Sequence, residues 1–213
     1  MSKGYEAIIY DLDGTLTDSI PLIMKTFKLA YKEVFGKVER TDEDLMSYIG
    51  KPLMQTFSDV HDEKTARLLF DTYLSINEKM LANNELLLFP GVRDSLARIK
   101  EAGVPQAIVT SKRFSSARIT LELQDLNGLF DQGVFLEDTK EHKPSPEPLF
   151  ECARRLGITD MSKVVYVGDA VVDFECAINA GADFALVSWT RMDIDGIRRL
   201  GQPRIISKLE ELL

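Results

Sequence analysis

The sequence predicts an α/β protein with a Rossmann-like, doubly wound parallel sheet and an inserted all-α cap domain. Short apolar runs recur along the chain, separated by segments long enough for helices: residues 7–10, 107–109, 133–136, 164–167 and 184–187. Apolar runs without alternation are typical of parallel strands buried on both faces. The second observation is an interruption. Residues 17–87 contain no convincing strand and repeat apolar residues at helical spacing.

The first apolar run, residues 7–10, is the first expected strand. The interrupting segment then shows two helical stripes, one from Ile20 to Val34 and one from Ala66 to Met80, the second broken by the polar residue Asn77. We therefore expect an α/β core formed by residues 1–16 and 88–213 and a helical insertion over residues 17–87.

Glycines mark the ends of the later helices. Gly103, Gly157 and Gly181 follow helical stretches 92–102, 146–156 and 174–180, where a left-handed residue commonly ends a helix. Ser207 and Glu210 have the spacing of a capping box and predict a last short helix.

Composition excludes several classes of protein. The 26 Lys and Arg against 34 Asp and Glu give a net charge of -8, which argues against binding to nucleic acid or to an anionic membrane surface. The apolar runs are far shorter than the roughly 20 residues that span a bilayer, and no signal peptide is expected. The two cysteines cannot form a disulfide framework. We expect a cytoplasmic monomer or homodimer.

Polar side chains follow the expected strands at their carboxyl ends, where ligands bind in open parallel sheets. In chain order they are Asp11, Asp13, Thr110, Ser111, Lys143, Asp169 and Asp173. Clustered carboxylates repel one another unless a cation intervenes, and oxygen ligands suit Mg²⁺. A cation, a lysine and a hydroxyl together match an incoming phosphate, which one carboxylate could attack. Asp11 and Asp13 point the same way along extended backbone, so one can attack while the other serves the leaving group.

These residues resemble the four motifs of the haloacid dehalogenase superfamily of aspartyl-phosphate phosphatases. The motifs are Ile9-Tyr10-Asp11-Leu12-Asp13-Gly14-Thr15-Leu16, Ile108-Val109-Thr110-Ser111, Lys143-Pro144, and Val167-Gly168-Asp169 with Asp173. The helical insertion is similar to the family's C1 cap. The resemblance extends over the whole chain and is strongest to the phosphoglycolate phosphatase and inorganic pyrophosphatase branch.

The resemblance implies a role for each residue. Asp11 would be the nucleophile and Asp13 the acid and base. Thr110, Ser111 and Lys143 would hold the phosphoryl oxygens. Mg²⁺ would be bound by Asp11, the backbone carbonyl of Asp13 and Asp169, with Asp173 orienting Lys143 or a metal-bound water.

The substrate is expected to be a small phosphorylated metabolite. The segment Tyr48-Ile49-Gly50-Lys51-Pro52-Leu53 resembles the family's substrate-specificity loop, and Lys51 could contact the non-reacting end of an anionic substrate. Lys112, Arg113 and Arg191 are further candidates for anion contact, but we expect them at the surface.

Two alternatives to a phosphatase stay open. A sugar phosphomutase would return the phosphoryl group to substrate instead of water. A non-catalytic binding protein on the same fold would normally lose a reacting carboxylate, whereas this chain keeps Asp11, Asp13, Lys143 and Asp169.

Overall fold

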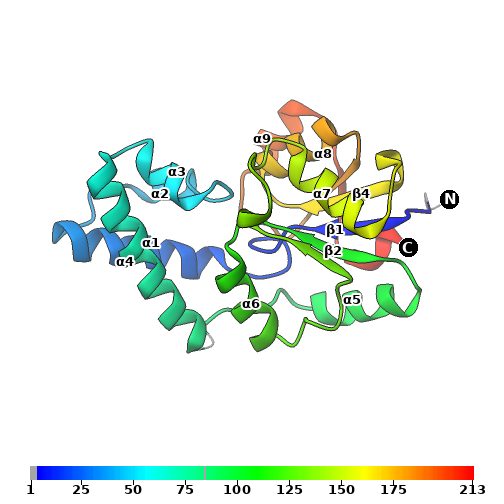
Figure 1. The fold of residues 1–213 in the computed structure, drawn as a ribbon, viewed down its shortest axis with the longest axis horizontal. Coiled ribbons are helices and arrows are strands. Elements are labelled where there is room, and N and C mark those ends of the chain that lie inside the picture. The colour runs from blue at the N-terminus through cyan, green and yellow to red at the C-terminus, as the bar shows by residue number, and fades with distance from the viewer. Residues whose placement is uncertain (1–3, 84) are drawn as a thin grey trace.

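The computed structural model describes residues 4–83 and 85–213. In this part of the chain a parallel sheet of six strands has the order β3-β2-β1-β4-β5-β6 (Figure 1). The strands are β1 (Ala7–Tyr10), β2 (Gln106–Val109), β3 (Gln132–Val134), β4 (Val164–Gly168), β5 (Asp183–Val187) and β6 (Arg204–Ile206). The five predicted strands are present, with ends shifted by up to two residues. The edge strand β6 was not predicted, because it has three residues and only Ile206 is buried.

Both faces of the sheet are buried, as the uninterrupted apolar runs predict. Successive residues of a strand point to opposite faces, so Ile8 and Ile9 belong to two different hydrophobic clusters. The covering helices are α5 (Val92–Glu101), α6 (Phe114–Leu123), α7 (Glu147–Leu156), α8 (Val171–Ala180) and α9 (Ile194–Leu200). The doubly wound α/β fold is therefore confirmed.

The segment between β1 and α5 is helical, as predicted. It contains α1 (Ile20–Phe35), α2 (Asp42–Met46), α3 (Leu53–Ser58) and α4 (Glu63–Ala82), which lie together beyond the end of the sheet (Figure 1). These helices enclose a third hydrophobic cluster, in which the ring of Phe27 contacts the rings of Tyr48, Phe57 and Tyr73. An inserted all-α cap is thus part of the fold.

The two connections to the cap lie side by side. The amide of Asp18 donates to the carbonyl of Leu87 at 2.8 Å, and the amide of Phe89 donates to the carbonyl of Leu16 at 3.1 Å. The division of the chain at residues 16/17 and 87/88 stays a prediction.

Short 3₁₀ turns complete the fold at Leu136–Asp138, Met161–Lys163 and Leu209–Leu212. The expected capping box of Ser207 with Glu210 is wrong by one residue. The amide and hydroxyl of Ser207 donate to Glu211 at 2.9 and 2.7 Å, whereas Glu210 accepts from Ser95 and Arg98. No described helix combines the length and apolar character needed to cross a membrane.

The order of the strands reverses between β1 and β4, because β2 lies on one side of β1 and β5 lies beyond β4. Such a switch point leaves a crevice at the carboxyl ends of the two central strands. Asp11 follows β1 and Asp169 follows β4, so the fold places both carboxylates at this crevice.

Candidate active site

A buried lysine lies at the centre of the predicted site. The ammonium of Lys143 donates to Asp11 Oδ1 at 2.8 Å and to Asp173 Oδ1 at 2.6 Å. It also lies 3.2 Å from the hydroxyl of Tyr166, a residue that the sequence analysis did not select. Tyr166 comes from the middle of β4 and its hydroxyl donates to the carbonyl of Val109 at 2.9 Å. Lys143 is therefore held in the interior by polar partners from the end of β1, from β4 and from α8.

Asp173 is placed by the start of α8. Its Oδ2 accepts the amides of Asp169 at 3.2 Å and Ala170 at 3.1 Å, which satisfies backbone donors at the helix N-terminus. This cap explains why α8 begins at Val171, three residues before the predicted start. A Cβ at Gly168 would lie 2.5 Å from the Cβ of Asp173, so the close approach requires glycine. Asp173 therefore caps the N-terminus of α8 with one carboxylate oxygen and accepts a hydrogen bond from Lys143 with the other.

A tight turn after β1 shapes the surroundings of Asp169. Gly14 has φ +86°, and a Cβ there would lie 2.3 Å from Asp169 Oδ2. The hydroxyls of Thr15 and Thr190 donate to the Asp169 carboxylate at 3.3 and 3.0 Å. The indole of Trp189 donates to the carbonyl of Thr15 at 2.9 Å, which ties this turn to the loop after β5. Thr190 is a site residue that sequence reasoning missed.

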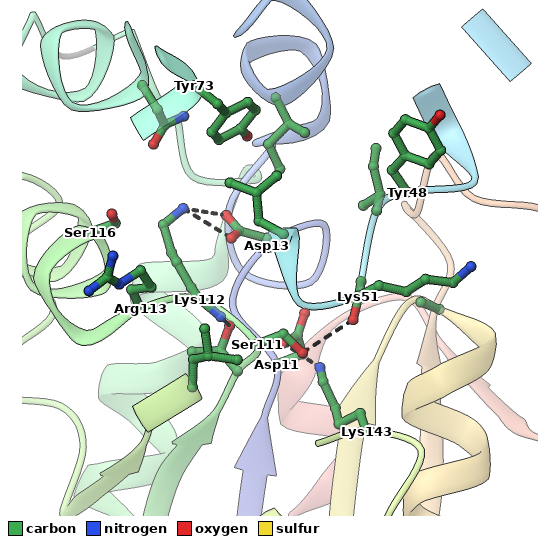
Figure 2. A pocket seen from close by; sticks show the side chains of 18 of the residues that line it. Asp11, Asp13, Tyr48, Lys51, Tyr73, Ser111, Lys112, Arg113, Ser116 and Lys143 are labelled. Carbon is green, nitrogen blue, oxygen red and sulfur yellow. Dashed lines mark hydrogen bonds and ion pairs between the residues drawn. The ribbon is translucent and has the colours of Figure 1, made fainter. Parts of the chain in front are cut away.

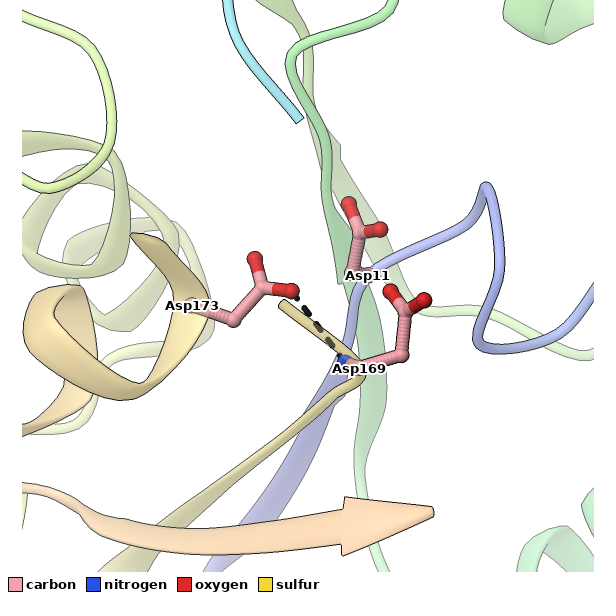
Figure 3. Close-up of side chains that lie close together, drawn as sticks. All are labelled: Asp11, Asp169 and Asp173. Atoms are coloured by element: carbon pink, nitrogen blue, oxygen red, sulfur yellow. Dashed lines mark hydrogen bonds between the residues drawn. The ribbon is translucent and has the colours of Figure 1, made fainter. Parts of the chain in front are cut away.

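Three carboxylates meet at this point. Asp11, Asp169 and Asp173 are buried, and one oxygen of each lies within 4.8 Å of the others. Figure 3 shows Asp11 and Asp169 side by side at the strand ends, with Asp173 facing them from α8. A compact set of carboxylate oxygens fits Mg²⁺, which prefers hard oxygen ligands. The side chain of Asp13 is not a member of this acidic group among the described residues.

Asp13 instead faces a lysine. The ammonium of Lys112 lies 3.0 Å from both carboxylate oxygens of Asp13, and the two side chains are 10% and 18% exposed (Figure 2). The expectation that Lys112 lies at the surface is therefore wrong, because the loop after β2 turns it toward the site. Arg191 is about half exposed and pairs with Asp18, as expected of a surface residue. Arg113 pairs with Glu137 and is 41% exposed, but it also lines the cavity of the candidate site.

The remaining predicted residues also line the site. Thr110 is buried, and its hydroxyl accepts the amide of Lys112 at 3.2 Å. The hydroxyl of Ser111 donates to the carbonyl of Gly50 at 3.2 Å, which links the core to a loop of the cap. Lys51 follows in that loop and its side chain is exposed. All eight predicted residues line one cavity of about 110 Å³ between the cap and the core.

Burial perturbs the ionisation of the cluster. Burial, opposed by Lys143 and reinforced by Asp173, raises the pKa of Asp11 to about 7. Burial together with Asp173 and Asp11 raises the pKa of Asp169 well above its usual range. Burial alone would lower the pKa of Lys143, but Asp11 and Asp173 raise it above its ordinary value, so this lysine stays charged. The cluster therefore favours a further cation.

The comparisons with known proteins agree with this geometry. A haloacid dehalogenase-like hydrolase family model matches residues 8–187. The chain is 33% identical over 213 residues to the pyrophosphatase PpaX of Bacillus velezensis, covering 99% of this chain and 96% of that one. The crystal structure of a haloacid dehalogenase-like hydrolase from Bacteroides fragilis superposes with a TM-score of 0.87 at 29% identity, covering 98% of this chain and 100% of that one.

A second solved structure, of a predicted phosphoglycolate phosphatase from Haemophilus somnus, shares the fold with a TM-score of 0.84 at 23% identity. The match covers 100% of this chain and 97% of that one. The carboxylate and lysine cluster lies at the switch point of the parallel sheet, where such folds bind ligands. The chain belongs to the haloacid dehalogenase-like hydrolases and is a phosphatase of that family.

Proposed function

We propose that this phosphatase is Mg²⁺-dependent and hydrolyses a small phosphorylated metabolite through an aspartyl phosphate on Asp11. The substrate would be a phosphoglycolate-like phosphomonoester or pyrophosphate. The observation that carries the proposal is the placement of Asp11. This residue is buried in the cavity, accepts a hydrogen bond from Lys143, and is followed two residues later by Asp13. The names of the relatives, a pyrophosphatase and a phosphoglycolate phosphatase, support this substrate class.

Asp11, Asp169 and the backbone carbonyl of Asp13 would hold the metal ion, with Asp173 beside them. Bound there, Mg²⁺ would supply positive charge to the phosphoryl oxygens and relieve the repulsion among the carboxylates. The raised pKa of Asp11 and Asp169 reflects the same need for positive charge.

In the first step a carboxylate oxygen of Asp11 attacks phosphorus and the bond from phosphorus to the leaving oxygen breaks. Asp13, protonated for this step, gives its proton to that oxygen, so the oxygen leaves as a hydroxyl group. Lys143, Thr110 and Ser111 would hold the phosphoryl oxygens while Lys112 keeps the carboxyl group of Asp13 in place.

In the second step Asp13 takes a proton from water, whose oxygen attacks phosphorus. The bond between Asp11 and phosphorus then breaks, which releases inorganic phosphate and restores both carboxylates to their starting states. Lys51, on the loop of the cap, would contact the outer end of the substrate.

The test is release of inorganic phosphate from an aryl phosphate with and without Mg²⁺. The wild type should require the metal, and Asp11→Asn should lose the activity. Asp71→Asn, an exposed change on α4, serves as the control and should keep it. If Asp11→Asn hydrolyses the ester as the wild type does, the proposed nucleophile is wrong. Analysis of products from a sugar phosphate separates hydrolysis from the phosphomutase reaction, which would yield an isomer without free phosphate.

A further inference from the structure

One side of the cavity lies where the loop after β2 meets helix α4 of the cap. The guanidinium carbon of Arg113 lies 5.8 Å from the centre of the ring of Phe70, a residue of α4. Arg113 belongs to the core, where it is the N-cap residue of α6, and both residues line the cavity. This cation–π contact holds the guanidinium against the cavity wall without using any of its N–H groups.

Arg113 keeps most of its hydrogen-bond donors free. A guanidinium carries five N–H groups in one plane. The N–H on Nε of Arg113 donates to Glu137 Oε1 at 3.1 Å, and Glu137 Oε2 accepts the amide of Phe114 at 2.9 Å. Among residues 4–83 and 85–213, the two terminal nitrogens of Arg113 donate to no side chain or carbonyl. Glu137 therefore fixes the arginine through Nε and leaves free the fork that can hold a carboxylate or a phosphate by two parallel hydrogen bonds.

Two buried polar side chains lie on the same side of the cavity. Ser116 lies one turn after Arg113 on α6, and Figure 2 shows the two residues side by side. Asn77 lies two turns after Phe70 on α4. Both Ser116 and Asn77 are 4% exposed, and neither side chain has a hydrogen-bond partner in the described residues. The fully enclosed, unpartnered side-chain atom in that part of the chain is Ser19 Oγ, so the polar atoms of Ser116 and Asn77 are accessible from the cavity that they line.

Lys51, on the loop of the cap, also lines the cavity. Figure 2 shows Lys51 and Arg113 on opposite sides of Asp13. Lys51 is exposed and Arg113 is half-buried, so solvent and salt screen the lysine more strongly. Glu137 is about half exposed, which weakens its repulsion of an anion at Arg113. The N-terminus of α6 adds partial positive charge there, since Arg113 is its N-cap and its first turn contains no acidic residue. The side of Arg113 is therefore the stronger site for an anion.

We propose that Arg113, Ser116 and Asn77 bind an anionic group at the outer end of the leaving group. The terminal nitrogens of Arg113 would hold two oxygens of that group, and the hydroxyl of Ser116 and the amide of Asn77 would donate to them. This inference rests on the proposed phosphatase function and deepens it. It assigns to these three residues the selection of an acidic leaving group, with a carboxylate or a second phosphate, over a neutral alcohol.

A matched pair of esters tests the charge. 2-Hydroxyethyl phosphate and phosphoglycolate have the same number of carbon atoms and differ in one end group, a hydroxymethyl or a carboxylate. With Mg²⁺ present, kcat/KM for phosphoglycolate or for pyrophosphate should exceed that for 2-hydroxyethyl phosphate at least tenfold. If the neutral ester is hydrolysed as well as both anionic compounds, the inference is wrong and the phosphatase function stands. If none of the three compounds nor an aryl phosphate is hydrolysed, the proposed function itself fails.

Variants of Arg113 test the assignment. Arg113→Met should lower kcat/KM for the preferred anionic compound at least tenfold, through loss of charge-assisted hydrogen bonds, and change that for 2-hydroxyethyl phosphate by less than about twofold. Arg113→Lys keeps the charge without the fork and should lose part of the preference. No loss in Arg113→Met, or equal losses on both compounds, would overturn the assigned role. Arg118→Met, which removes a cation of α6 that does not line the cavity, is the matched control and should leave the ratio unchanged.

Variants of Lys51 and Asn77 locate the anion within the cavity. Lys51→Met should lower kcat/KM for the anionic compound less than Arg113→Met does, because solvent screens its charge. A larger loss in Lys51→Met would place the anion on the other side of the cavity and overturn the inference. Asn77→Leu should lower the preference about fivefold through loss of one hydrogen bond. Glu78→Gln, at the next and exposed position of α4, should leave it unchanged. Thermal melting confirms that each variant is folded.

Discussion

Lys112 and Asp13 form an ion pair at the carboxyl ends of β2 and β1, with the ammonium 3.0 Å from both carboxylate oxygens. The lysine comes from the loop after β2 and the aspartate from the turn after β1. Because both side chains are largely buried, solvent screens their attraction weakly. The residue proposed to transfer protons is thus held by a neighbouring strand's loop, with further support from the hydroxyl of Thr17 at 3.4 Å.

Replacing Lys112 with Met should lower kcat about tenfold, since a charge-assisted hydrogen bond contributes about 1.5–3 kcal/mol and its loss frees the carboxyl group of Asp13. Steady-state kinetics on an aryl phosphate with Mg²⁺ measures this. Arg118→Gln, which removes an exposed cation of α6 that does not line the cavity, should have little effect. Unchanged kcat in Lys112→Met would contradict a positioning role for this lysine.

Gly14→Ala should abolish metal-dependent activity. A Cβ at this position would lie 2.3 Å from Asp169 Oδ2, so the carboxylate must move. Gly36→Ala is a matched control, because Gly36 also has positive φ, +76°, but its Cβ would meet nothing within 4 Å. Both variants should lose stability through backbone strain, and only Gly14→Ala should lose affinity for Mg²⁺, as titrated by calorimetry. Equal affinities in the two variants would show that Asp169 is not constrained by this turn.

Asp11→Asn should raise the melting temperature of the metal-free protein at pH 8 by about 2–4 °C for each kcal/mol gained. Burial raises the pKa of Asp11 to about 7, so the ionised carboxylate at pH 8 is unfavourable in the folded state. The amide removes that charge, while Lys143 keeps its ion pair with Asp173. Differential scanning calorimetry without metal checks this, with Asp71→Asn as the reference. A lower melting temperature in Asp11→Asn would show that the carboxylate stabilises the fold.

The stabilisation by Mg²⁺ should grow with pH. Asp11 ionises near 3.8 in an unfolded chain and near 7 in the folded protein, so between these values the folded state binds the extra proton. The free energy of unfolding without metal therefore falls, through this group, as pH rises from about 4 to above 7. Mg²⁺ competes with that proton, so its upward shift of the melting temperature should be small at pH 5 and larger at pH 8. A shift independent of pH would argue against Asp11 as a ligand.

The fold and the centre of the site could be predicted because both depend on local patterns. Uninterrupted apolar runs mark β1 and β4, and the residues directly after a parallel strand must lie at its carboxyl end. Asp11, Lys143, Asp169 and Asp173 therefore come together as expected. Their chemical roles stay predictions until the variants above are measured.

The residues that were missed depend on contacts between distant segments. Thr190 bonds Asp169 across 21 positions and Tyr166 is buried in the middle of a strand, where a tyrosine ordinarily serves packing. Lys112 follows Thr110-Ser111 directly, a position that could have signalled its inward direction. Asn77 was visible in the sequence as a polar exception in the stripe of α4, and the structure places it in the lining of the cavity.

The hydrogen bond from Ser111 to the carbonyl of Gly50 joins the core to the cap through a single proton. A serine hydroxyl has only one proton to donate. A phosphoryl oxygen held by Ser111 must take the proton that now secures the loop containing Gly50. The substrate and the carbonyl of Gly50 would therefore compete for the same hydrogen atom, so arrival of the substrate would release the loop and departure of phosphate would let the bond to the cap form again.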